Sequence, residues 1–225
     1  PSGVQYHKLL DIGRAAIEEL APRPLGERLR YRALRAIVPN RTLFKASLAL
    51  GRLFRQVLPA ALAAKIPARA PAPAGEVPAP RHARRMLMLE GCVQPGLSPN
   101  TNAAAARVLD RLGIGIEPAP KAGCCGAVDY HLNAQEAGLA KARRNIDAWW
   151  PHIEAGAEAI IQTASGCGAF VKEYGDLLRD DPAYAAKARR VSELAKDLVE
   201  VLREQTLETL GAKADKRLAF HCPCT

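Results

Sequence analysis

Several features that mark common protein classes are scarce or missing in this sequence. Aromatic residues make up only 5% of the 225 residues, which argues against a surface that stacks nucleic-acid bases. No apolar run approaches the roughly 20 residues that a bilayer span requires. The beginning of the chain lacks the charged-then-apolar pattern of a secretory signal. We therefore expect a cytoplasmic protein whose thiols stay reduced and which binds no nucleic acid.

Two motifs with well-understood chemistry are also absent. Gly113-Ile-Gly115 precedes no predicted helix, so the sequence contains no glycine-rich loop for a dinucleotide. None of the six cysteines forms a C-x-x-C pair, because Cys222 and Cys224 have one residue between them. Paired C-x-x-C motifs are typical of structural zinc sites and of thiol–disulfide oxidoreductases. Both functions are therefore weaker candidates.

Positive charge is concentrated at the beginning of the chain. Residues 1–85 hold 16 Lys and Arg against 5 Asp and Glu, whereas residues 86–225 are nearly neutral. Apolar residues at helical spacing predict helices over 4–20, 25–38 and 42–65, the last kinked or divided at Pro59. One interpretation is a basic helical extension that packs on its own domain or on a partner subunit. The other is docking on an anionic membrane surface, on the inner face of the cell membrane.

The composition divides the chain into four parts. Residues 1–66 form the basic helical extension, and residues 67–84, rich in Pro and Ala, form an extended linker. Residues 85–216 form an α/β domain. Residues 217–225 follow it, and the family resemblance described below implies that they begin a second, truncated repeat. In the α/β domain, strands predicted at 86–89, 114–118 and 159–163 alternate with helices at 102–112, 133–150, 168–178 and 184–204. This alternation predicts a parallel sheet, with a fourth strand at 218–221.

Cysteines follow each of the predicted strands. Cys92 follows the first strand, Cys124-Cys125 the second and Cys167 the third, while Cys222 follows the last. Ligands of parallel sheets lie at the carboxyl ends of the strands, so we expect these thiols to meet at one edge. Glycine or proline beside each cysteine lets the backbone turn closely around a bulky group. An iron–sulfur cluster, which needs thiolates from scattered loops, fits this pattern. Buried inert thiols, a zinc site and a thiol oxidoreductase are the alternatives.

The cysteine pattern resembles the cysteine-rich CCG domain. That domain occurs in heterodisulfide reductase and in iron–sulfur subunits of flavin-linked hydroxy-acid dehydrogenases. The likeness is greater to the iron–sulfur subunit of glycolate dehydrogenase (glycolate oxidase). The stretches that carry it are Leu9-Leu-Asp-Ile-Gly-Arg14, Glu90-Gly-Cys-Val-Gln-Pro95, Ala122-Gly-Cys-Cys-Gly126, Thr163-Ala-Ser-Gly-Cys-Gly-Ala-Phe-Val-Lys-Glu-Tyr174 and Ala219-Phe-His-Cys-Pro-Cys-Thr225.

The resemblance implies a piece of an electron-transfer subunit. Members of the family have an N-terminal ferredoxin-like module and a second CCG repeat, most of which this sequence does not contain. Electrons from FAD on a partner subunit, which oxidises glycolate, would pass through the clusters to a quinone or another acceptor. This piece alone is not expected to be catalytic. A cluster-based disulfide or sulfur reductase is the alternative within the family, and a zinc-binding interaction module is the alternative outside it.

The resemblance also implies a set of ligands. Cys92, Cys124, Cys125 and Cys167 are the predicted cluster ligands, and Cys222 and Cys224 are further candidates for metal binding. Ala164 stands where members with a full motif begin a C-x-x-C. Four thiolates still suffice for a [4Fe–4S] cluster. Glu90 and His131 are secondary candidates for contact with the site.

Overall fold

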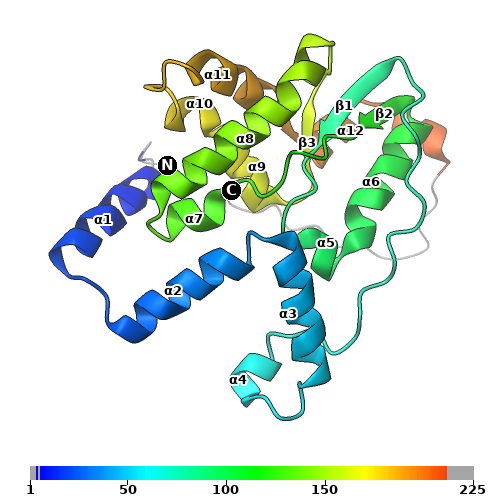
Figure 1. Cartoon of the computed structure of the whole chain (residues 1–225). Coiled ribbons are helices and arrows are strands. Elements are labelled where there is room, and N and C mark those ends of the chain that lie inside the picture. Colours follow the sequence, from blue (N-terminus) through cyan, green and yellow to red (C-terminus); the bar gives the residue numbers. More distant parts are fainter. Residues whose placement is uncertain (1–3, 5, 212–225) are drawn as a thin grey trace.

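Four short strands form one parallel sheet in the computed structural model, which describes residue 4 and residues 6–211 (Figure 1). The order across the sheet is β2-β1-β3-β4, and each neighbouring pair is parallel. The strands are β1 (Arg84–Met88), β2 (Ile114–Glu117), β3 (Ile160–Gln162) and β4 (Ala195–Asp197). The α/β class with a parallel sheet is therefore confirmed.

Helices cover both faces of this sheet. Figure 1 shows α8 and α6 on opposite sides of it. The helices of this part of the chain are α5 (Gln94–Leu97), α6 (Pro99–Arg111), α7 (Ala127–His131), α8 (Gln135–Glu154), α9 (Ser165–Lys172), α10 (Tyr174–Leu177), α11 (Ala185–Leu194) and α12 (Leu198–Arg203), followed by a 3-10 turn (Leu207–Leu210).

The apolar residues of β1 supply both faces of the core. Met86 and Met88 pack with Leu109 of α6 and Val201 of α12 on one face. Leu87 packs on the opposite face, with side chains from α8, α9 and α11. Successive side chains of a strand point to opposite faces, so a fully apolar strand is what a sheet covered on both sides requires.

The strand β4 was not predicted. The sequence predicts one continuous helix over 184–204, but the structure has α11, then β4, then α12. Asp197 explains the break, because it caps α12 through a capping box with Glu200. The extended residues before this cap pair with β3. The predicted fourth strand at 218–221 lies outside the described residues.

Two further helix predictions differ in detail. The helix predicted over 133–150 is α8, which continues through Pro151 to Glu154. The proline stands one turn from the end of this helix, where its missing N–H removes only one hydrogen bond. The helix predicted over 168–178 begins earlier, at Ser165, and is divided into α9 and α10.

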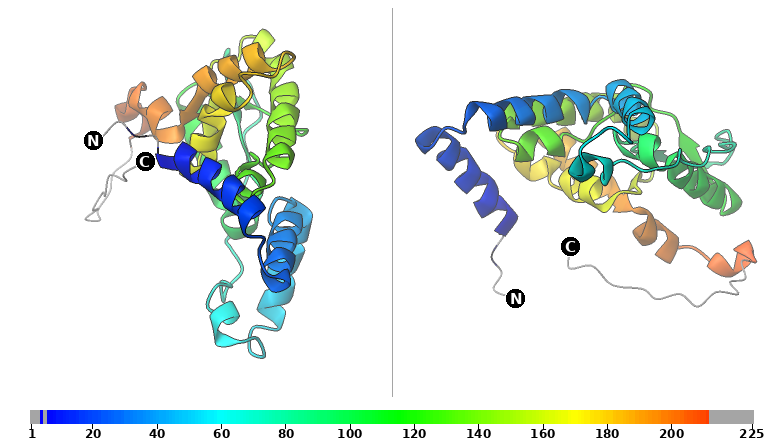
Figure 2. Two further views of the ribbon diagram at one scale, coloured as in Figure 1. Left: turned by 90° about the vertical axis from the view of Figure 1, so that its left-hand side faces the viewer. Right: turned by 90° about the horizontal axis from the view of Figure 1, so that it is seen from below.

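The N-terminal extension consists of four helices that lie outside the sheet's two helical layers (Figures 1 and 2). They are α1 (Tyr6–Leu20), α2 (Leu25–Ile37), α3 (Arg41–Leu53) and α4 (Ala60–Ala63). The predicted division near Pro59 is present, because α3 ends at Leu53 and Pro59 precedes α4. No residue within α2, α3 or α4 is buried. No helix in the described part of the chain has the length and apolar character to cross a bilayer.

The Pro/Ala-rich segment after α4 contains no helix or strand before β1, which begins at Arg84, the last residue of the predicted linker, and the segment packs on α6. Arg107 donates hydrogen bonds of 3.0 Å to the backbone oxygens of Ala74 and Glu76. Arg81 and His82 both contact the Asp110 carboxylate, at 2.7 and 2.8 Å. Burial disfavours the charged carboxylate, but these two contacts outweigh it and lower the pKa of Asp110.

Candidate functional site

The four central cysteines line one cleft of about 580 Å³. Cys92 follows β1, the Cys124-Cys125 pair follows β2, and Cys167 lies in the first turn of α9 after β3. The carboxyl ends of parallel strands meet at the same edge of a sheet, so the topology itself gathers these thiols. The predicted convergence is therefore found. Cys222 and Cys224 lie outside the described residues, and their role stays a prediction.

The cleft is mostly apolar apart from its sulfur atoms, two glutamines and three hydroxyl side chains (Ser98, Thr101 and Thr163). Cys92, Cys124 and Cys125 are buried, and Cys167 is partly exposed. Apolar side chains form most of the remaining wall: Leu89, Val93, Leu97, Ala127, Val128 and Ala164. A low-polarity surrounding of this kind controls the access of solvent to a metal–sulfur centre.

The turn after the two adjacent cysteines requires glycine. Gly126 has φ of 103° and stands at the N-terminus of α7. A Cβ atom at this position would lie 2.5 Å from the backbone oxygen of Gly138 in α8. The positive φ and the close approach both exclude a larger residue. Gly126 and Gly138 thus allow the loop to lie directly against α8.

Two buried polar side chains hold the backbone of the cysteine loop. Asn145 of α8 accepts a hydrogen bond from Gly123 N at 2.9 Å and donates one to Cys124 O at 3.0 Å. The hydroxyl of Tyr174 donates to Cys125 O. Asn145 also donates to the Tyr174 hydroxyl, at 3.3 Å. Both side chains are fully buried, so the sulfur positions are fixed from the interior.

The sequence did not predict the roles of Asn145 and Tyr174. The only signal for Asn145 is a polar residue on the apolar face of a predicted helix, between Ala142 and Trp149. Such a residue must find a hydrogen-bond partner when it is buried. Tyr174 stands at the end of a quoted motif, but nothing in the sequence connects it to Cys125.

The four thiols interact with one another in the order Cys92, Cys124, Cys125, Cys167. Hydrogen bonds from Cys125 and Cys92 lower the pKa of Cys124 to about 3. The same contact with Cys124, together with burial, raises the pKa of Cys92. Hydrogen bonding to Cys124 and Cys167 likewise raises the pKa of Cys125. Hydrogen bonding from Cys125 lowers the pKa of Cys167. These contacts favour the thiolate at Cys124 and Cys167 and the protonated thiol at Cys92 and Cys125. Metal binding requires the thiolate form, so it would release protons from Cys92 and Cys125.

Positive charge from α8 lies next to the cysteine loop. Arg144 donates to Cys124 O at 3.2 Å, and the charge of Lys141 helps to lower the pKa of Cys124. Lys141 forms an ion pair with the buried carboxylate of Asp129, which Arg35 of α2 also contacts at 3.4 Å. Cations at this position favour bound thiolates and the negative charge of a cluster.

The four thiols provide the kind of ligand that an iron–sulfur cluster needs. Such a cluster is held at its corners by separate thiolates, and the four cysteines line one mostly apolar cleft. Among the described residues, no group of three or more Cys, His, Asp or Glu side chains is placed to hold one metal ion.

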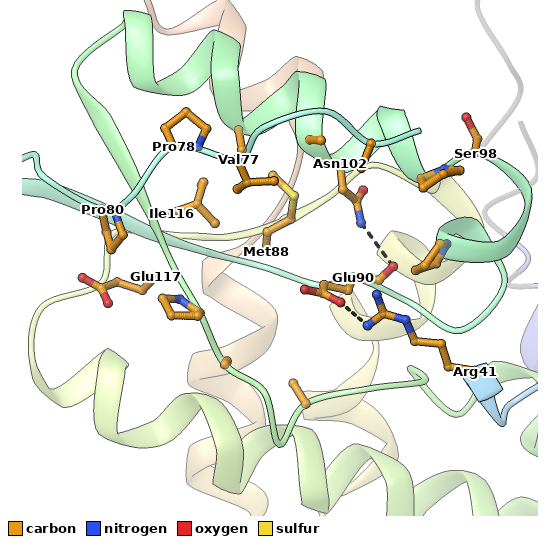
Figure 3. Close-up of a pocket in the computed structure, with 18 of the residues that line it drawn as sticks. Arg41, Val77, Pro78, Pro80, Met88, Glu90, Ser98, Asn102, Ile116 and Glu117 are labelled. Atoms are coloured by element: carbon orange, nitrogen blue, oxygen red, sulfur yellow. Dashed lines mark hydrogen bonds and ion pairs between the residues drawn. The ribbon is translucent and has the colours of Figure 1, made fainter. Parts of the chain in front are cut away.

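The secondary candidates do not line the cysteine cleft. Glu90 faces a neighbouring cavity of about 430 Å³, where its carboxylate pairs with Arg41 and its backbone oxygen accepts from Asn102 (Figure 3). His131 instead contacts Asp11 of α1, at 3.0 Å. Both residues therefore connect the extension to the α/β part, and neither is among the residues that line the cleft of the four described cysteines.

Comparison with known proteins agrees with this geometry. Residues 86–172 match the family model described as "Cysteine-rich domain", CCG. The match includes Cys92, Cys124, Cys125 and Cys167, and it extends from β1 into α9. The chain carries a CCG cysteine-rich domain. The resemblance stated from the motifs is confirmed.

Several known proteins match a longer part of the chain than the family model does. It is 65% identical over its whole length to the Escherichia coli (strain K12) "Glycolate oxidase iron-sulfur subunit", of which it covers 55%. It is 30% identical to the "Probable glycolate oxidase iron-sulfur subunit" of Bacillus subtilis, with 91% of this chain and 51% of that protein aligned. A 27% match to "Lactate utilization protein A" of Bacillus licheniformis covers 59% of the chain and 54% of that protein.

The chain spans about half the length of these curated relatives. No solved structure matches it.

Proposed function

We propose that this chain is part of the iron–sulfur electron-transfer subunit of a flavin-linked hydroxy-acid dehydrogenase, with glycolate as substrate. The observation that carries the proposal is the convergence of four cysteines on one cleft. The identity of 65% to a glycolate oxidase iron-sulfur subunit supports the choice of complex. The match to lactate utilization protein A supports the broader class of hydroxy acids.

Cys92, Cys124, Cys125 and Cys167 would hold the cluster, of the [4Fe–4S] type. When bound, such a cluster accepts and releases one electron at a time. Asn145 and Tyr174 hold the backbone that carries Cys124 and Cys125, and the lining of the cleft keeps the surroundings mostly apolar. Cys222 or Cys224 would complete or extend the ligand set. In this proposal the chain sets the position and potential of the cluster, and a partner binds the substrate.

The partners would be FAD-containing subunits on one side and a quinone or another acceptor on the other. Large exposed apolar side chains on the N-terminal helices support a docking role for that region, for example Leu20, Leu25 and Leu53. The basic charge of residues 1–85 would favour an anionic membrane surface. We therefore propose a cytoplasmic protein that associates with the inner face of the cell membrane.

A cluster-based disulfide or sulfur reductase is the second candidate. It is favoured by the partial exposure of Cys167, which lets a sulfur substrate reach the cleft. The glycolate proposal has the stronger support, because the relatives are named as a glycolate oxidase subunit and a lactate utilization protein.

Metal analysis of the full-length protein, purified without oxygen, tests the cluster. We expect iron and acid-labile sulfide together with a broad visible absorption band. Serine substitution of Cys92, Cys124, Cys125 or Cys167 should each lower the iron content, and Cys224→Ser measures whether the C-terminal cysteines contribute. Zinc without colour, or full iron content in Cys124→Ser, would contradict the proposed ligand set.

Purification of the whole complex tests the reaction. A flavoprotein that reduces a dye with glycolate should copurify with the full-length subunit. Reduction of a disulfide substrate without any response to glycolate would favour the second candidate instead.

A further inference from the structure

The amide of Gln162 has no partner in the described part of the protein. Gln162 is 1% exposed, and neither its Nε2 nor its Oε1 atom makes a hydrogen bond. Native proteins pair almost all buried polar groups, so an unpaired one indicates a missing partner. Elsewhere in the described chain, only Arg52 and Trp149 have buried side-chain nitrogen atoms without a hydrogen bond.

The position of Gln162 identifies the missing partner. It is the last residue of β3 and lines the same cleft as the four cysteines. Side chains alternate along a strand, so Gln162 lies on the same face as Ile160, which belongs to the core cluster that includes Cys125. Its Cβ and Oε1 lie beside Gly168, in the turn of α9 that carries Cys167.

The sulfur atoms expected in the cleft determine whether the NH₂ group or the oxygen of the Gln162 amide can form a hydrogen bond with them. A thiolate or an inorganic sulfide accepts hydrogen bonds and donates none, so only the NH₂ group of Gln162 can serve it. Hydrogen bonds to the sulfurs of a cluster are one determinant of its reduction potential. A donor stabilises the more negative, reduced cluster and so raises the potential.

We propose that Gln162 donates a hydrogen bond to a sulfur atom of the cluster and sets its reduction potential. This role rests on the proposed function, since it requires a cluster in the cleft. Gln162 is a positioning and tuning residue and is not itself a ligand. A water molecule is the competing partner for the amide. If water rather than the cluster pairs with Gln162, replacing Gln162 by Met should leave the reduction potential of the cluster nearly unchanged.

Gln94 provides a matched control. It lines the same cleft, but its amide already has protein partners: Nε2 donates to Thr163 at 2.8 Å, and Oε1 accepts from the Thr163 hydroxyl at 3.1 Å. Gln94→Met and Gln162→Met therefore make the same chemical change in one cleft. Only the second removes an amide that lacks a protein partner.

The test is a redox titration of the full-length protein in its complex, followed by electron paramagnetic resonance. We expect Gln162→Met to keep its iron and sulfide and to lower the midpoint potential. A tenfold smaller equilibrium constant for reduction of the cluster corresponds to a midpoint potential lower by about 59 mV for a one-electron couple. Gln94→Met should shift the potential much less. Equal shifts in both variants, or no shift in a loaded Gln162→Met protein, would overturn the proposal.

A second measurement does not depend on how the variant folds. Wild-type protein labelled with ¹⁵N at glutamine side-chain amides should show a magnetic coupling between that nitrogen and the reduced cluster. If the protein contains a cluster but shows no such coupling, the role of Gln162 is refuted while the proposed function stands. A wild-type protein without iron and sulfide would instead refute the proposed function.

Discussion

The α/β part of the chain and its N-terminal extension have similar apolar content but use it in opposite ways. In the α/β part, Leu109 of α6 is 0% exposed and packs with apolar side chains of the sheet and with Val201 of α12. In the extension, Leu29 of α2 is 62% exposed, and most of the large exposed apolar side chains lie in this region. Helical periodicity therefore predicted helices in both parts, yet among the described residues only the α/β part builds a core.

Polar contacts take the place of a core in the extension. Lys8 and Asp11 of α1 contact Asp176 and His131 of the α/β part. Arg35 of α2 contacts Asp129, and Arg41 of α3 contacts Glu90. Ion pairs at a protein surface contribute little stability, about 0–1 kcal/mol each. The extension is thus positioned on the α/β part while its apolar surface stays available for a partner.

The largest expected effect comes from a matched pair of leucines on helices. Leu109→Ala should lower the free energy of unfolding by about 2–5 kcal/mol, because it leaves a cavity in a closed core. Leu29→Ala should change it by less than about 0.5 kcal/mol. Urea unfolding of the full-length protein measures both. Similar losses in the two variants would remove the contrast between the regions.

A pair of tyrosines tests whether the cysteine loop is held from the interior. Tyr174→Phe removes the hydroxyl that donates to Cys125 O and should cost about 1–3 kcal/mol, since buried polar groups lose a partner. Tyr184→Phe is the control, because its hydroxyl donates to the exposed Asp147, and it should cost less than about 0.5 kcal/mol. We also expect a lower iron content in the first variant only.

Alkaline pH should weaken the α/β part through the same residue. Burial raises the pKa of Tyr174 well above its ordinary value. The folded protein therefore keeps this proton after the unfolded chain has lost it. The associated stability is complete below about pH 10 and is lost as pH rises toward the raised pKa, by up to about 1.4 kcal/mol per pH unit. Urea unfolding at several alkaline pH values should show a smaller decline in Tyr174→Phe than in wild type.

The smallest expected effect concerns the contact between α2 and the α/β part. Arg35→Gln removes one ion pair of Asp129, which keeps its pair with Lys141. Global stability should fall by no more than about 1 kcal/mol, while amide hydrogen exchange in α2 becomes faster. Arg32→Gln, on the same helix and exposed, is the control. Unchanged exchange in Arg35→Gln would show that other contacts hold the extension.

Particular residues show how far sequence reasoning reached. The apolar runs predicted β1, β2 and β3. The cysteines after these strands could be predicted to meet without knowledge of the strand order, because all strands of a parallel sheet end at the same edge. The strand β4 was missed, because three residues with mixed polarity carry no periodic signal. Their pairing with Ile160, Ile161 and Gln162 supplies the stabilisation.

The order of residues along the chain specifies which atoms are available: six thiols, each placed after a predicted strand or beside a glycine or proline. It also determined the periodicity that makes the sheet parallel and covered on both faces. Folding was needed to bring Asn145 and Tyr174 to the cysteine loop, and to bury the Gln162 amide beside the cleft with no partner among the described residues. These are contacts between residues distant in sequence, and their energy depends on burial and direction, which local pattern does not encode.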